Sequence, residues 1–294
     1  MQQSEQDILR RIRKIEIKTK GLSNEIFAGK YHTAFRGRGM SFSEVRDYRI
    51  GDDVRDIDWN VTARSSKPHI KVYEEERELT MMLLIDVSGS NMFGTSERFK
   101  RNMVTEIAAV LAFSATQNND KVGCIFFSDK VEKFIPPKKG RSHILTIIRE
   151  LVRFEPTSPK TAISEAVRYL TNVNKKHCTA FILSDFLNAD SDSAALEDAL
   201  KIASGKHDVV GIQIFDQREA ELPSVGMVEM KDAESGKLYW VDTSSRRVRE
   251  HYAQTWAHQQ QAIEELLMRN RIDAIRISTD ADYVKELIKL FKKR

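Results

Sequence analysis

The chain has 294 residues, enough for one large domain or for a medium domain with a smaller one beside it. Its 47 Lys and Arg and 43 Asp and Glu give a net charge of +4, and the two signs are interspersed, so no nucleic-acid partner is expected from charge. Since it has no signal-peptide pattern and no run of about 18 apolar residues, we expect no transmembrane segment and a cytoplasmic location.

Residues 1–79 are expected to form a small N-terminal region of one helix and some β structure. The first element is a basic amphipathic helix with Ile8, Ile12 and Ile15 on its apolar side. We expect it to pack on its own domain, and peripheral association with an anionic membrane is the alternative. The Gly-rich stretch "RGRGMSFSEVRDYRIGDDVRDIDWNV" then predicts short strands and turns.

The segment Gly51 to Trp59, "GDDVRDIDW", carries four carboxylates that could suggest a second metal site or a nuclease-like cluster. They are Asp52, Asp53, Asp56 and Asp58. The segment lacks the DxDxDG pattern and the distal Glu of a calcium loop, and Arg49 and Arg55 are available as partners. We therefore expect structural pairing and helix capping, with Trp59 filling the core.

Residues 80–294 alternate between apolar runs and helical patterns. The runs "LTMMLLID", "CTAFILSD" and "HDVVGIQIF" are nearly continuous, which is typical of strands covered on both faces. The pattern predicts an α/β fold with a doubly wound, mostly parallel sheet. The expected helices cover about 97–117, follow Arg141, Thr161 and Asp192, cover 247–269, and start at Asp282.

Two hairpins interrupt this alternation. Residues 121–135, "KVGCIFFSDKVEKFI", predict a hairpin at the sheet edge, and residues 225–242 predict a second one that turns at Glu234 to Gly236. We expect the second hairpin to be an excursion from the sheet.

The two cysteines, Cys124 and Cys178, each lie in a short apolar run. Their spacing matches neither a metal-ligand nor a redox motif. They are therefore expected to be buried, reduced thiols, with a disulfide as the less favoured alternative.

Oxygen-bearing side chains gather where predicted strands end. Asp86, Ser88 and Ser90 follow one strand in "LLIDVSGSN", Asp185 closes another, and "EPTSPKTAISEAV" places Thr161 near a helix start. Ligands of open parallel sheets bind at such strand ends, and Mg²⁺ binds a few hard oxygen ligands while it keeps several waters. The sequence thus predicts a Mg²⁺ or Mn²⁺ site, although these side chains could instead cap backbone amides.

Enzyme motifs are scarce. The chain has no Walker loop and no HExxH pair, and Asp86 stands where a GxSxG nucleophile elbow needs Gly. We expect no enzymatic activity. A metal-dependent phosphohydrolase or nuclease that uses the same strand-end oxygens remains the alternative.

The ordered set of a DxSxS strand end, "TAISEAV" and the Asp that closes a later strand resembles a von Willebrand factor A domain. The resemblance implies a metal-ion-dependent adhesion site. Ser88, Ser90 and Thr161 would be hydroxyl ligands, Asp86 and Asp185 would ligate directly or through water, and one position would accept an acidic group from a partner. Lys160 stands where such domains usually have Gly, so Thr157 is the alternative ligand.

The preceding stretch, from about Arg36 to Glu78, is similar to a bacterial family of unknown function. Genes of that family usually lie beside those of MoxR-type AAA ATPases. The resemblance implies an adaptor or chaperone-like partner of such an ATPase. A protein that bears an acidic residue would be the second partner.

Overall fold

The computed structural model describes residues 13–16, 41–65, 67–74, 79–89, 100–187, 193–231 and 237–294. The chain divides into two compact units. One is Phe35–Leu79, and the other combines Met1–Ala34 with Thr80–Arg294. In the larger unit, residues 13–16 are helical, Ile15 is buried, and Glu16 accepts a 2.6 Å hydrogen bond from Arg141 Nε.

One mixed sheet forms the centre of the larger unit. Its described strands are β3 (Thr80–Asp86), β4 (Lys121–Phe127), β5 (Val131–Lys138), β6 (Thr179–Ser184), β7 (Asp208–Phe215) and β10 (Asp273–Ser278). They are ordered β10-β7-β6-β3-β4-β5, and β4–β5 is the antiparallel pair. The predicted α/β class, the mostly parallel sheet and the edge hairpin are therefore confirmed.

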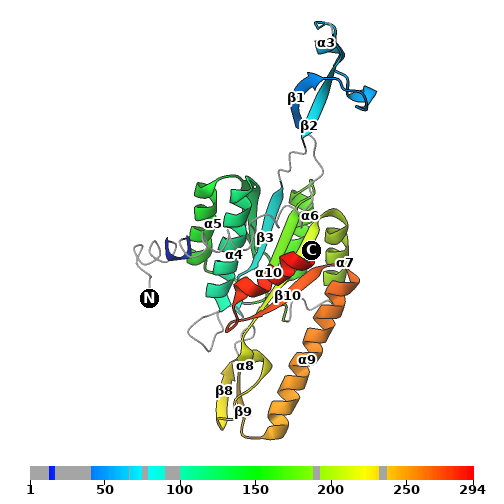
Figure 1. Cartoon of the computed structure of the whole chain (residues 1–294). Helices are drawn as coiled ribbons and strands as arrows, with labels where there is room; N and C mark the ends of the chain where they lie inside the picture. Colours follow the sequence, from blue (N-terminus) through cyan, green and yellow to red (C-terminus); the bar gives the residue numbers. More distant parts are fainter. Residues whose placement is uncertain are drawn as a thin grey trace. The chain divides into compact units, whose positions relative to one another are not determined.

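Helices lie on both faces of this sheet (Figure 1). They are α4 (Lys100–Gln117), α5 (Arg141–Arg153), α6 (Ile163–Val173), α7 (Ser193–Lys206) and α10 (Tyr283–Lys293). Residues 81–86 of β3 are all buried, as expected of a strand covered twice. Met82 and Leu84 belong to the apolar cluster that includes residues of α6 and α7. The rings of Phe181 in β6 and Phe291 in α10 pack edge to face, with their centroids 6.4 Å apart.

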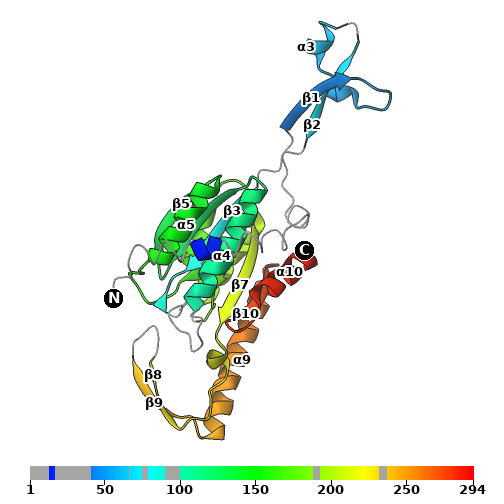
Figure 2. The ribbon, with the colours of Figure 1, turned by 60° about the vertical axis from the view of Figure 1, so that its left-hand side comes forward.

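An excursion separates β7 from β10. It comprises α8 (Gln217–Ala220), the strands β8 (Met227–Lys231) and β9 (Leu238–Asp242), and α9 (Arg246–Arg269). The strands β8 and β9 pair antiparallel outside the main sheet, which confirms the second hairpin. Both ribbon views show it extending away from the sheet (Figure 2). The predicted turn at Glu234 to Gly236 lies outside the described residues.

Two further expectations about the larger unit concern the membrane and the thiols. Among the helices of the described ranges, none is both long enough and apolar enough to cross a bilayer. Cys124 and Cys178 are both buried free thiols, as expected.

The smaller unit is built on the antiparallel pair β1 (Ser41–Asp47) and β2 (His69–Glu74), with the short helices η1 (Val54–Asp56) and α3 (Trp59–Thr62) between them. Of the four aspartates predicted to pair or to cap helices, Asp52, Asp53 and Asp58 do so. Asp53 caps η1 and Asp58 caps α3 through their side-chain oxygens. Asp52 forms a two-bond ion pair with Arg46 at 2.8 Å, which lowers the pKa of Asp52 to about 2.

The expectation that Trp59 fills a core is wrong. Its side chain is 68% exposed, since it is the first residue of a one-turn helix at the surface of a small unit. Among the described residues of this unit, the buried apolar side chains are Ile70 and Leu79.

Candidate metal centre

The candidate site lies where the winding of the sheet reverses. The strand β3 pairs with β4 on one side and with β6 on the other. The connection after β3 therefore leads to one side of the sheet, and the strands from β6 onward lie on the other side. Asp86 is the last residue of β3, Ser184 is the last residue of β6, and Asp185 follows it. The Ser184 hydroxyl donates a 2.6 Å hydrogen bond to Asp86 Oδ2, so the two strand ends are directly joined. This is the place where open α/β sheets bind ligands.

Asp86 is a buried carboxylate with 1% exposure. Its Oδ1 accepts a 2.9 Å hydrogen bond from the backbone N–H of Ser88, which is also buried. Burial, and then the negative charge of Asp185, raise the pKa of Asp86 to about 6. Both effects disfavour the ionised form of Asp86. A cation beside this carboxylate would stabilise that ionised form.

The third part of the site is the loop between α5 and α6. Gly89 N–H donates to the Pro159 carbonyl at 3.0 Å, and Ala162 N–H donates to the Ser128 carbonyl at 2.8 Å, so this loop is fixed against the ends of β3 and β4. Thr161 is 7% exposed, and its Oγ1 has no hydrogen-bond partner within the described part of the chain. A buried hydroxyl without a partner is costly unless a ligand satisfies it. These groups fit a hard cation.

Thr157, the alternative ligand on the same loop, differs from Thr161 because its hydroxyl has a partner. The Thr157 hydroxyl lies 2.7 and 2.9 Å from the two carboxylate oxygens of Glu132 and donates to that group. Lys160 is exposed. Its charge is therefore in water, where its repulsion of a buried cation is weakened.

Asp185 has a different environment from Asp86. Its Oδ2 lies 2.9 Å from Lys100 Nζ, its Oδ1 accepts from Leu187 N–H at 3.1 Å, and its carbonyl accepts from Gln213 at 2.7 Å. Lys100 is fully buried and also pairs with Glu219 at 2.6 Å. Burial alone would lower the pKa of Lys100, but the charges of Asp185 and Glu219 outweigh it and raise that pKa.

The turn after Asp185 is tightly specified. Phe186 has a φ of 57°, in the left-handed region that an aromatic residue seldom adopts, and its N–H donates to the Ser184 hydroxyl at 3.0 Å. Its side chain is buried in the core cluster. Packing thus holds a strained turn in place beside the site.

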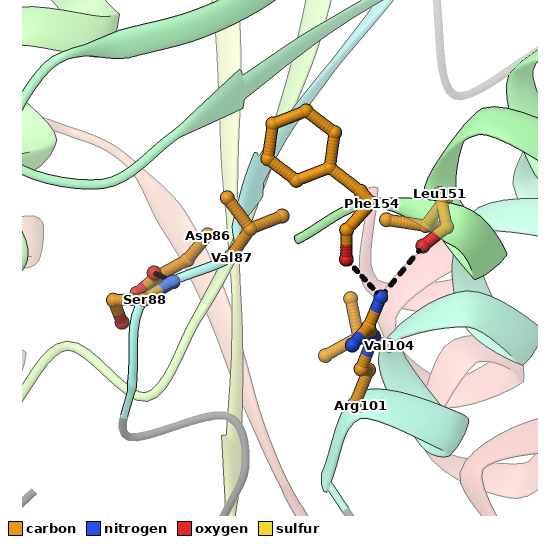
Figure 3. A pocket seen from close by; sticks show the side chains of 7 residues that line it. All are labelled: Asp86, Val87, Ser88, Arg101, Val104, Leu151 and Phe154. Carbon is orange, nitrogen blue, oxygen red and sulfur yellow. Dashed lines mark hydrogen bonds between the residues drawn. The ribbon is translucent and has the colours of Figure 1, made fainter. Parts of the chain in front are cut away.

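A small pocket lies next to Asp86 and Ser88 (Figure 3). Figure 3 shows these two residues on one side and Arg101 on the other, with Val87 and Phe154 between them. The Arg101 guanidinium donates to the carbonyls of Leu151 and Phe154 at the end of α5. The full lining is Asp86, Val87, Ser88, Arg101, Val104, Leu151 and Phe154.

The structure thus brings Asp86, Ser88, Thr161 and Asp185 onto three linked loops, while Ser90 lies outside the described residues. Within the described ranges, no group of three or more His, Cys, Asp or Glu could hold a metal, so any ion here would depend on hydroxyl oxygens as well. Lys100 and Glu219 were not predicted from the sequence. They are 85 and 119 positions away from their partners Asp185 and Lys100, and no local motif marks such pairs.

Several known proteins are similar to this chain. The "Uncharacterized protein Mb1516" of Mycobacterium bovis is 27% identical over 287 residues, which is 96% of this chain and 88% of that protein. The crystal structure of an aerotolerance-related membrane protein from Bacteroides fragilis matches 74% of this chain and 100% of its own, with 16% identity and a TM-score of 0.50. The SpRpn10 VWA domain matches 74% of this chain and 96% of its own, with 11% identity and a TM-score of 0.41.

A family match covers most of the chain. Residues 44–262 match the family described as "Protein of unknown function DUF58". The matched range includes the smaller unit from Glu44 in β1 onward, the candidate metal centre and most of α9. The chain therefore belongs to the DUF58 family.

Proposed function

We propose that this protein is a non-enzymatic protein-interaction module whose binding depends on a divalent cation, Mg²⁺ or Mn²⁺, at the candidate metal centre. The observation that supports it most directly is Thr161. Its buried hydroxyl has no partner within the described residues, on a loop joined by hydrogen bonds to the ends of β3 and β4. A buried hydroxyl that lacks a hydrogen-bond partner within the described residues, on a loop that meets two strand ends, is well suited to bind a hard cation.

The ligands would come from all three loops. Ser88 and Thr161 would supply hydroxyl oxygens, Ser90 is a third candidate from the motif, and Asp86 would supply the charge. Asp185 is held by Lys100 and would act from farther away. When bound, the ion would supply a coordination position for an oxygen ligand from outside the chain.

The ligand from outside would be a carboxylate. A divalent cation that keeps exchangeable waters binds Asp or Glu of another protein readily. An interaction role requires no catalytic base at the site. By the resemblance of residues 36–78 and of the DxSxS motif, the proposed partner is a MoxR-type AAA ATPase, for which this protein would be an adaptor or chaperone-like component.

The test is capture of a purified MoxR-type AAA ATPase from the same organism, in Mg²⁺ and in EDTA. The wild type should bind in Mg²⁺ and be released by EDTA, whereas Asp86→Ala should fail to bind in either buffer because it removes the charge of the site. The matched control is Asp198→Ala, on the exposed side of α7, which should behave as wild type. Equal capture by wild type and Asp86→Ala would reject the metal-dependent mechanism.

A further inference from the structure

Lys100 is a fully buried lysine beside the candidate metal centre, at the start of α4. Its ammonium lies 2.9 Å from Asp185 Oδ2 and 2.6 Å from Glu219 Oε1. A buried lysine needs such carboxylates, because removing its charge from water is costly. The Lys100 ammonium is thus a cation already paired with Asp185, one of the two acidic residues of the candidate site.

Glu219 is itself fixed in place. Its Oε2 accepts a 3.0 Å hydrogen bond from Asp216 N–H in the capping box of α8, and Asp216 Oδ2 accepts from Thr279 at 3.1 Å. The carboxylate of Glu219 is therefore a fixed negative charge that holds Lys100 from the side of α8. Lys100 is shared between a carboxylate of the metal centre and a carboxylate outside it.

We propose that Lys100 is a built-in counter-cation that sets how tightly the site binds its divalent ion, and that Glu219 tunes this effect by holding part of the lysine charge away from Asp185. The inference depends on the proposed function and deepens it. An ammonium on Asp185 repels an incoming cation and neutralises a charge that would attract it. Lys100 and Glu219 are positioning residues here, since neither is proposed to touch the ion.

The proposal predicts opposite effects for two neighbouring substitutions. Lys100→Met removes the competing charge, so Mg²⁺ should bind more tightly, by at least about fivefold in the dissociation constant. Glu219→Gln leaves the whole lysine charge on Asp185, so Mg²⁺ should bind more weakly by a similar factor. If the two residues only maintained the fold, both substitutions would weaken binding.

The measurement is calorimetric titration of the metal-free full-length chain with Mg²⁺, with thermal unfolding in EDTA to confirm that each variant is folded. Lys201→Met and Glu221→Gln make the same charge changes at exposed positions and should bind Mg²⁺ as the wild type does. Lys100→Met leaves two carboxylates without their buried partner and should lower the melting temperature. Glu219→Gln keeps an acceptor for Lys100, so this variant tests the proposal even if Lys100→Met does not fold.

The outcomes separate this inference from the proposed function. Tighter binding by Lys100→Met together with weaker binding by Glu219→Gln supports it. Mg²⁺ binding by Lys100→Met, with none by the wild type, also supports the inference, because it shows that the lysine blocks the ion. That result would reject the proposed metal-dependent function. Wild-type binding that Glu219→Gln leaves unchanged or tightens overturns the inference alone, and absence of binding by every variant overturns both.

Discussion

At the scale of single residues, the candidate site combines satisfied and unsatisfied groups. The Thr157 hydroxyl is bonded to Glu132, whereas Thr161 Oγ1 is buried without a partner within the described residues. Two threonines of one loop thus differ in what their hydroxyls do for the protein without metal. This difference gives a direct test of whether Thr161 serves the fold or a ligand.

We predict that Thr161→Val leaves the free energy of unfolding in EDTA unchanged or raises it by about 1 kcal/mol, because it removes a desolvated hydroxyl and keeps the shape. The same variant should bind Mg²⁺ more weakly. Thr157→Val, its matched control, should lower the free energy of unfolding by about 1 kcal/mol, since it removes a hydrogen bond to a charged acceptor. Urea unfolding in EDTA measures both, and an equal loss of stability in the two variants would mean that Thr161 has a structural role.

The sequence marks those residues of the candidate site that belong to a local motif. Asp86 ends an apolar strand, Ser88 follows it, and Thr161 lies close to a helix start. It could not identify Lys100, which stands in the helical pattern of α4 without any sign of its distant partners. The prediction for Trp59 was wrong for a related reason. Its size suggested a buried core residue, but the smaller unit does not pack a core around it.

At the scale of elements, the edge hairpin depends on a close backbone contact. A Cβ on Gly123 would lie 2.7 Å from Met82 Sδ, 3.0 Å from Pro137 N and 3.1 Å from the Ile135 carbonyl oxygen. The register of the β4–β5 ladder shifts at this point, between Val122 and Cys124. Proline is tolerated opposite the shift because β5 is an edge strand.

We therefore predict that Gly123→Ala lowers the free energy of unfolding by about 1 to 3 kcal/mol, since backbone atoms of β5 cannot move aside as a flexible side chain can. Gly205→Ala, near the end of α7, is the control, because nothing lies within 4 Å of its Cβ position. That variant should be more stable by up to about 1 kcal/mol from helix propensity. Chemical denaturation compares the two, and a neutral Gly123→Ala would show that the hairpin adapts.

Elements were predictable where the apolar pattern was long. The continuous runs of β3, β6 and β7 reflect burial on both faces, and the pattern 225–242 showed its hairpin by two strand-like segments around a turn. The pattern could not reveal how exposed that hairpin is. Leu238, Tyr239 and Trp240 look like a core strand in sequence, yet all three are exposed.

At the scale of the whole molecule, the order of the strands positions the candidate site. Because β4 and β6 flank β3, the loops after β3 and β6 and the loop before α6 meet at the carboxyl ends of these central strands. The alternation of elements predicted a doubly wound sheet but not the strand order, which depends on long-range packing. The location of the site follows from that order and from the general rule that ligands bind where the winding reverses.

The carboxyl ends of β3 and β6 are proposed to bind one divalent cation through Asp86 and its neighbours. The most direct test is calorimetric titration of the metal-free protein with Mg²⁺ and with Mn²⁺, beside Asp86→Ala. We expect one ion bound per wild-type chain, and no binding by a folded Asp86→Ala variant. Binding that is unaffected by the substitution, or no binding of either ion by the wild type, would contradict it.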